Sequence, residues 1–161
     1  ELTAESFDEE GYFNTGDIGE YDHDGFLTLT GRVKDQFKTD KGKYISPAPL
    51  ELILSQNPNI EQICIVGTGI PQPIALVTLS DGAKKKQKSE LIESLISTLK
   101  QVNPDFEKHE KIQKVVVMKE NWDLSNGLIT PTMKVKRNSI EKIHQGYYKS
   151  WFDNEDTVIF E

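Results

Sequence analysis

Two short segments are the most informative part of this sequence: YFNTGD at residues 12–17 and GRVKD at residues 31–35. Residues 18–21 and 26–30, which lie between them, are rich in β-forming side chains. The intervening DHDG at residues 22–25 has the composition of a turn. We therefore predict a β-hairpin that joins the two segments.

This hairpin would carry a carboxylate, Asp17, at the start of one strand and a guanidinium, Arg32, at the end of the return strand. A carboxylate can accept hydrogen bonds from the paired hydroxyls of a ribose, and a guanidinium can donate to a ribose or a phosphate. Each segment alone is common in proteins. Their spacing, with Lys38 and KYISP at residues 43–47 following, indicates a nucleotide site.

The chain resembles the C-terminal part of the adenylate-forming superfamily, which contains acyl-CoA synthetases, nonribosomal-peptide adenylation domains and firefly-type luciferases. FKT at residues 37–39 and GKYISP at 42–47 are most similar to the long-chain fatty acyl-CoA synthetase branch. A second match, LITPTMKVKR at residues 128–137, is similar to the final signature of the superfamily. The resemblance covers about residues 11–137 and extends loosely to Trp151.

The resemblance implies a two-step reaction, in which a carboxylate attacks the α-phosphate of ATP and the thiol of CoA then attacks the acyl-adenylate. Lys134 matches the adenylation lysine and would stabilise negative charge that develops in the first step. Lys136 and Arg137 are weaker candidates, and all three could instead form an exposed basic segment before a helix. The superfamily usually has glycine before this lysine, where this chain has Met133.

The resemblance also implies a set of nucleotide-binding residues. Asp17 would bind the ribose hydroxyls of ATP with help from Arg32, and Thr15 is a further candidate. The alternative for Asp17 is a carboxylate that caps a turn. Tyr12 could line the nucleotide pocket or only pack on the hairpin.

Three more positions are implied in the second step and in domain motion. Lys34 falls where the superfamily has its hinge residue, although Lys34 and Asp35 could equally be an exposed ion pair of little energy. Lys38 and Gly42 would approach the pantetheine thiol, since a glycine permits close backbone approach to a narrow tunnel. One residue more separates Lys38 from Gly42 than in shorter members.

The expected ligands are ATP or AMP, CoA and Mg²⁺, with Mg²⁺ bound mainly by an N-terminal adenylation domain that would be the main partner. Fatty acid and CoA would be the substrates. We predict no metal site in this chain, because His23, His109 and His144 are isolated, have no partner at metal-ligand spacing and look like surface residues. The single Cys64 lies in an apolar run and is predicted to be buried and inert.

Charge is distributed unevenly along the 161 residues, whose net charge is −7. Residues 1–30 hold nine acidic and no basic side chains, whereas the remainder has 17 acidic and 19 basic ones. We therefore predict a boundary that separates residues 1–31, the last hairpin segment of a large N-terminal domain, from residues 32–161, a mobile C-terminal α+β domain. The absence of an initiating Met and of a signal-peptide pattern in ELTAE at residues 1–5 suggests a piece of a longer protein.

Composition argues against two classes of partner. The one basic run, Lys84–86, has no interleaved aromatic residues, so nucleic acid is not an expected partner. No apolar run approaches the roughly 20 residues that span a bilayer. The expected location is the cytoplasm, with peripheral membrane contact of the full-length protein left open.

Hydrophobic periodicity predicts an α+β fold with a small mixed or antiparallel sheet flanked by helices. A small hairpin at 37–38 and 44–45 leads to a helix from Pro47 to about Gln56, with Ser46 as its N-cap. Further elements follow, in this order: strands 60–66 and 74–79, helix 88–102, strand 112–118, and a last helix from a capping box at 138–141 to Tyr148. Residues 151–161 have no assigned role.

The leading hypothesis is the C-terminal fragment of an ATP-dependent acyl-CoA synthetase, an AMP-forming acid–thiol ligase that needs the rest of the protein for turnover. One alternative is an adenylation domain that delivers its acyl group to a carrier protein. Another is a non-catalytic module that binds a nucleotide or CoA. Acyl chain length is not predicted by these residues.

Overall fold

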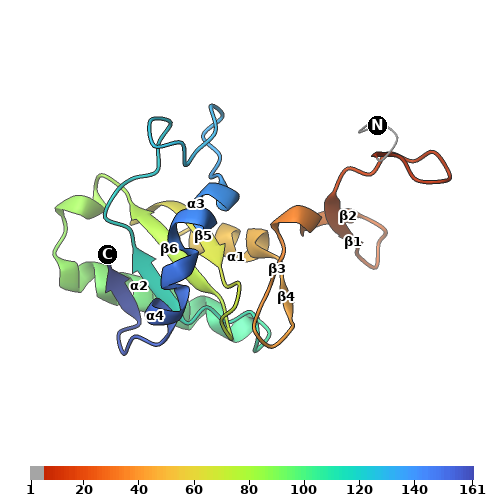
Figure 1. The fold of residues 1–161 in the computed structure, drawn as a ribbon. Coiled ribbons are helices and arrows are strands. Elements are labelled where there is room, and N and C mark those ends of the chain that lie inside the picture. The colour runs from red at the N-terminus through yellow and green to blue at the C-terminus, as the bar shows by residue number, and fades with distance from the viewer. Residues whose placement is uncertain (1–5) are drawn as a thin grey trace.

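The computed structural model describes residues 6–161, so residues 1–5 of the predicted segment 1–31 lie outside the described part. The predicted hairpin is confirmed: β1 (Asp17–Tyr21) pairs antiparallel with β2 (Leu27–Arg32). Its turn is held by Asp22, whose Oδ1 accepts from the backbone N–H groups of Asp24 and Phe26, both at 2.9 Å. Figure 1 shows the hairpin projecting away from the rest of the molecule.

A single 3-10 turn, Val33–Asp35, leads from β2 into the remainder of the chain. A second small hairpin follows, β3 (Phe37–Lys38) with β4 (Tyr44–Ile45), as predicted. Helix α1 then spans Pro47–Leu54 and ends two residues earlier than expected. Ser46 occupies the N-cap position as predicted, but its hydroxyl makes no capping hydrogen bond and instead accepts from the Gln36 amide at 2.9 Å.

The main sheet is mixed and has the order β5 (Ile60–Val66), β6 (Ile74–Leu79), β7 (Lys114–Val117), β8 (Val158–Phe160). The first pair is antiparallel, and the other two pairs are parallel. The third strand is shorter than the predicted 112–118 because both backbone groups of Ile112 bond to the Asn103 side chain, each at 2.9 Å. The C-terminal tail, which had no assigned role, supplies the edge strand.

Three further helices complete the fold: α2 (Lys88–Val102), α3 (Arg137–His144) and α4 (Tyr148–Phe152). The second helix has its predicted bounds. The last predicted helix is instead divided by a 3-10 turn at Gln145–Tyr147. The predicted capping box is wrong as well, because α3 begins at Arg137 and Asn138 therefore lies inside the helix.

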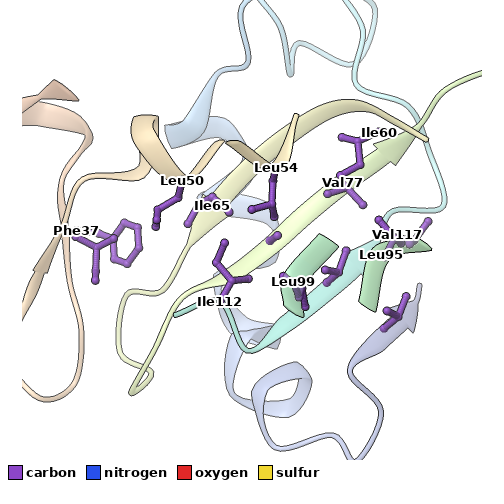
Figure 2. Close-up of a cluster of buried hydrophobic side chains, with 14 residues drawn as sticks. Phe37, Leu50, Leu54, Ile60, Ile65, Val77, Leu95, Leu99, Ile112 and Val117 are labelled. Atoms are coloured by element: carbon purple, nitrogen blue, oxygen red, sulfur yellow. The ribbon is translucent and has the colours of Figure 1, made fainter. Parts of the chain in front are cut away.

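Side chains that alternate along the sheet fill two cores. One face packs against α1 and α2, and Figure 2 shows this cluster around Ile65, Val77 and Val117. The other face packs against α3 and α4 through Cys64, Val66, Ile74, Leu76 and Val116, together with Ile140, Tyr148 and Trp151. The sheet is thus the middle of three layers, which confirms the α+β prediction.

Two titratable side chains lie in the second core. Cys64 is buried as predicted, and burial raises the pKa of its thiol to about 12, so the thiolate is not formed near neutral pH. His144 contradicts its prediction as a surface residue, since only 8% of it is exposed. It follows Ile140 by four residues and so shares the inward face of α3. Burial lowers the pKa of His144, and the Glu161 carboxylate, 3.7 Å from Nδ1, opposes that effect.

Candidate functional site

At the open end of the N-terminal hairpin, a carboxylate and a guanidinium form an ion pair. Asp17 and Arg32 are directly opposed in the β1–β2 register, and Arg32 Nε donates to Asp17 Oδ1 at 2.8 Å. Thr15 Oγ1 accepts from the Asp17 backbone N–H at 3.1 Å. The Arg32 guanidinium therefore orients the carboxylate and leaves further acceptor positions on it.

A pocket of about 620 Å³ lies beside this pair. Its lining includes Thr15, which precedes β1, Asp17 at the start of β1, and Lys34 from the 3-10 turn that follows the hairpin. Three of the residues predicted from the sequence are thus gathered around one cavity. The chemistry of this lining, a carboxylate with a hydroxyl and an ammonium, suits a polyhydroxylated anionic ligand.

The second hairpin carries the two residues that were assigned to the thiol-transfer step. Lys38 Nζ lies 5.5 Å from the centroid of the Tyr44 ring. Gly42 has φ +77° and donates to the Thr39 carbonyl at 3.0 Å. A Cβ at this glycine would be 3.6 Å from Lys38 Cε, which is ordinary contact. Backbone conformation, more than space, therefore requires glycine at residue 42.

Lys134 stands near the tip of a closed turn. Ile129 and Val135 form an isolated antiparallel bridge, and the Thr130 N–H donates to the Lys134 carbonyl at 2.8 Å. Thr130 also accepts from the Lys134 N–H, through Oγ1 at 3.1 Å. The backbone of Lys134 is thus bonded on both sides while the residue is exposed. This arrangement presents a cation on a fixed support.

Met133 adopts a conformation that normally belongs to glycine. Its φ of 63° is in the left-handed region. The superfamily usually has glycine at the matching position, so the backbone shape implied by the resemblance is present even though the residue differs. Because the Met133 side chain is largely exposed, its packing contributes little toward the cost of that conformation.

A second pocket, of about 570 Å³, lies next to the Lys134 turn. It is lined by the end of that turn and the start of α3, by Glu51 of α1, and by Asp35. Lys34 and Asp35 therefore face different cavities instead of pairing with each other. The 3-10 turn Val33–Asp35 connects the N-terminal segment, which ends with the β1–β2 hairpin, to the rest of the chain, and we call this turn the joint between the two segments.

Arg137 makes buried contacts that the sequence did not indicate. Its side chain is only 14% exposed, so it is not part of an exposed basic segment. The guanidinium donates to Glu51 and to the Ile65 carbonyl, and it lies 3.3 Å from Cys64 Sγ. Glu51 is 86 residues away in the sequence, and local periodicity contains no signal for such a pair.

The predicted site residues thus form three groups. The first group is Thr15, Asp17, Arg32 and Lys34, which lie together. The second is Lys38 and Gly42, which share the β3–β4 hairpin. The third is Lys134, which lies on the segment between β7 and α3. Figure 1 shows the segment between β7 and α3 on the other side of α1 from the β3–β4 hairpin. Among residues 6–161, no group of three or more histidine, cysteine or acidic side chains is arranged to hold a metal ion.

Comparison with known proteins assigns a family to most of the chain. Residues 34–154 match the model of the AMP-binding enzyme C-terminal domain. The long-chain-fatty-acid–CoA ligase FadD15 of Mycobacterium tuberculosis is 35% identical over 157 residues, covering 87% of this chain and 26% of that protein. The long-chain-fatty-acid–CoA ligase 5 of Mus musculus is 27% identical over 172 residues, covering 96% of this chain and 25% of that protein. The chain therefore spans about a quarter of the length of these relatives.

A solved structure supports the fold. The A-PCP didomain of carboxylic acid reductase from Segniliparus rugosus, in complex with AMP, superposes with a TM-score of 0.77 at 21% identity. The match covers 95% of this chain and 22% of that one. Of the helices in residues 6–161, none is both long and apolar enough to cross a lipid bilayer.

Proposed function

The chain belongs to the family of AMP-binding enzyme C-terminal domains, and from that premise we propose that it is the C-terminal part of an ATP-dependent acyl-CoA synthetase. The overall reaction joins a fatty acid to CoA and converts ATP to AMP and pyrophosphate. The observation that carries the proposal is Lys134, an exposed cation whose backbone is bonded on both sides within a closed turn. The ligase names of the relatives at 35% and 27% identity support the substrate class.

In the adenylation step, Lys134 stabilises the negative charge that develops as the carboxylate attacks the α-phosphate. A cation aids such a step when it is positioned before the charge develops, because the protein then needs no reorganisation. The turn from Ile129 to Val135 provides this fixed support. Pyrophosphate leaves, and the acyl group remains bonded to AMP.

The nucleotide occupies the cavity at the end of the N-terminal hairpin. Asp17 accepts from the ribose hydroxyls, and Arg32 holds that carboxylate in place by its 2.8 Å contact. Thr15 and Lys34 lie on the wall of the same cavity. Lys34 is therefore close to the ligand as well as at the joint between the two segments. We assign the segment that ends at residue 31 to the large domain.

In the thioester-forming step, the β3–β4 hairpin faces the acyl-adenylate. Lys38 and Gly42 approach the pantetheine arm of CoA, whose thiol attacks the acyl carbon and releases AMP. The segment between β7 and α3, which carries Lys134, and this hairpin lie on different sides of α1 (Figure 1), so we infer that one orientation does not present both. The domain therefore rotates between the steps about the Val33–Asp35 turn.

Other features are assigned to the rest of the full-length protein. We place Mg²⁺ and the pocket for the fatty acid mainly in the N-terminal adenylation domain. The lone buried thiol and the nucleotide substrates suit a cytoplasmic enzyme.

The experiment that tests this proposal is fatty-acid-dependent exchange of pyrophosphate into ATP by the full-length protein. Exchange is expected with fatty acid and not without it, and CoA is expected to convert the adenylate to a thioester. The 161-residue chain alone is the control, and it should release no pyrophosphate. A full-length protein that binds ATP but shows no acid-dependent exchange would make the chain a binding module. Transfer to a carrier protein in preference to CoA would identify the acceptor as that protein.

A further inference from the structure

Arg137 forms a buried node where three parts of the chain meet. Its guanidinium donates to the Glu51 carboxylate of α1 and to the Ile65 carbonyl of β5. The same Glu51 carboxylate accepts from the Ile65 N–H at 2.8 Å. Burial disfavours the charged guanidinium, but the Cys64 and Glu51 groups outweigh that effect and raise the pKa of Arg137. Arg137 is therefore charged at any working pH.

This node anchors one leg of the Lys134 turn. The first leg, at Leu128 and Ile129, is buried in the core. The second leg runs from Val135 to Arg137 and is tied to the first by the Lys136 N–H, which donates to the Leu128 carbonyl at 2.8 Å. The turn is closed by its own hydrogen bonds. The orientation of the turn relative to the sheet is therefore set by the buried first leg together with the guanidinium that fixes the end of the second leg.

The same node is linked to the joint between the two segments. Glu51 lies one turn into α1, and Ser46, just before that helix, accepts from Gln36 Nε2 at 2.9 Å. Gln36 directly follows the Val33–Asp35 turn. Asp35 itself lines the pocket beside Lys134. A continuous series of contacts therefore runs from the joint through α1 to the Lys134 turn.

We propose that Arg137 is a positioning residue that, through its ion pair with Glu51, fixes the Lys134 turn to α1. This inference rests on the proposed function. A rotation at the joint is then transmitted to Lys134 as a rigid-body movement. In this role the ion pair acts by setting where the Lys134 ammonium lies in the adenylation pose.

The first experiment measures the turn itself in the 161-residue chain. Backbone ¹⁵N relaxation should give Lys134 an order parameter near the roughly 0.85 of rigid backbone in the parent chain. In Arg137→Gln it should fall toward about 0.6, the flexible range, while the β6 amides are unchanged. Leu99→Ala is the matched control, because it removes a core side chain on α2 and leaves the Lys134 turn untouched. That control should leave the Lys134 order parameter at the parent value.

The second experiment measures each half-reaction in the full-length protein. Arg137→Gln should slow pyrophosphate exchange about 10- to 100-fold, the usual effect of a misplacement near 1 Å. The KM for ATP and the CoA-dependent consumption of preformed acyl-adenylate should change less than about threefold. Arg137→Lys should recover part of the exchange rate, because an ammonium keeps the charge but not the paired geometry. Leu99→Ala should affect both half-reactions alike.

The outcomes separate this inference from the proposed function. If the parent protein lacks acid-dependent exchange, both are wrong. If the parent is active and Lys134→Ala is not, but Arg137→Gln exchanges normally, only the positioning role is wrong. Equal loss of both half-reactions in Arg137→Gln also overturns it. Should Arg137→Gln fail to fold, Glu51→Gln approaches the same pair from its other side, and an unchanged Lys134 order parameter and exchange rate there would refute the role.

Discussion

Replacing Arg137 by glutamine removes a charge from a pair of side chains that are only 14% and 21% exposed. Glu51 then keeps its bond from the Ile65 N–H but loses its counter-ion, and the Ile65 carbonyl loses its donor. Breaking a buried ion pair from one side typically costs about 3–5 kcal/mol. Because both side chains retain some exposure, we expect about 3 kcal/mol of lost stability for the 161-residue chain.

The assay is urea unfolding followed by tryptophan fluorescence, since Trp122 and Trp151 are both buried. Lys149→Gln is the matched control: Lys149 also forms an ion pair, with Asp153 at 3.0 Å, but the two side chains are 83% and 57% exposed. An exposed pair of this kind is worth less than about 1 kcal/mol. Equal midpoints for Arg137→Gln and Lys149→Gln, at unchanged m-values, would refute the reasoning.

Three more results are expected. Met133→Gly should leave the free energy of unfolding in urea unchanged or raise it by up to about 1 kcal/mol, because relief of the left-handed backbone outweighs the entropy of glycine; a loss above about 0.5 kcal/mol would contradict the strain at φ 63°. Burial lowers the pKa of His144 below the 6.5 of an unfolded histidine. The unfolded chain therefore binds more protons, and stability should fall as the pH is lowered from about 7.5 to about 5.5. His144→Gln should flatten that slope, and an unaltered slope would show that another group causes it. Lys34→Pro should impair the thioester step far more than adenylation in the full-length protein, because proline restricts the joint; parallel loss of both rates in a folded protein would exclude a hinge at this residue.

The sequence was sufficient for those parts of the fold whose signals are local. Strands 60–66 and 74–79 and helix 88–102 were predicted at their observed bounds, because β-branched runs and a leucine stripe are contained within each element. The edge strand β8 was missed, since three residues whose partner is about 40 positions away have no pattern of their own. The division of the last helix was missed for a related reason, because tertiary packing of Tyr148 and Trp151 directs the chain there.

Prediction of the candidate site from the sequence was limited in the same way. Motif matches predicted Asp17, Thr15 and Lys34, which the fold places around one cavity. Motif reasoning treated Arg137 as a weak duplicate of Lys134, because both are cations in one basic run. Only the fold distinguishes them, since it directs Lys134 outward and turns Arg137 in toward Glu51. His144 was wrongly predicted to be exposed, because its neighbours Trp151 and Glu161 are brought to it only by the tertiary fold.

The most direct test of the account is the effect of Lys134→Ala on the two half-reactions of the full-length protein, with Lys136→Ala as the control. Lys136 lies two residues away and is also exposed, so it matches the charge change without the assigned role. We expect Lys134→Ala to slow pyrophosphate exchange by about 10²- to 10³-fold, the usual effect of losing one preorganised stabilising group. Thioester formation from supplied acyl-adenylate should be nearly unchanged, and Lys136→Ala should resemble the parent in both assays. Normal exchange by Lys134→Ala, or equal loss in both half-reactions, would contradict the account.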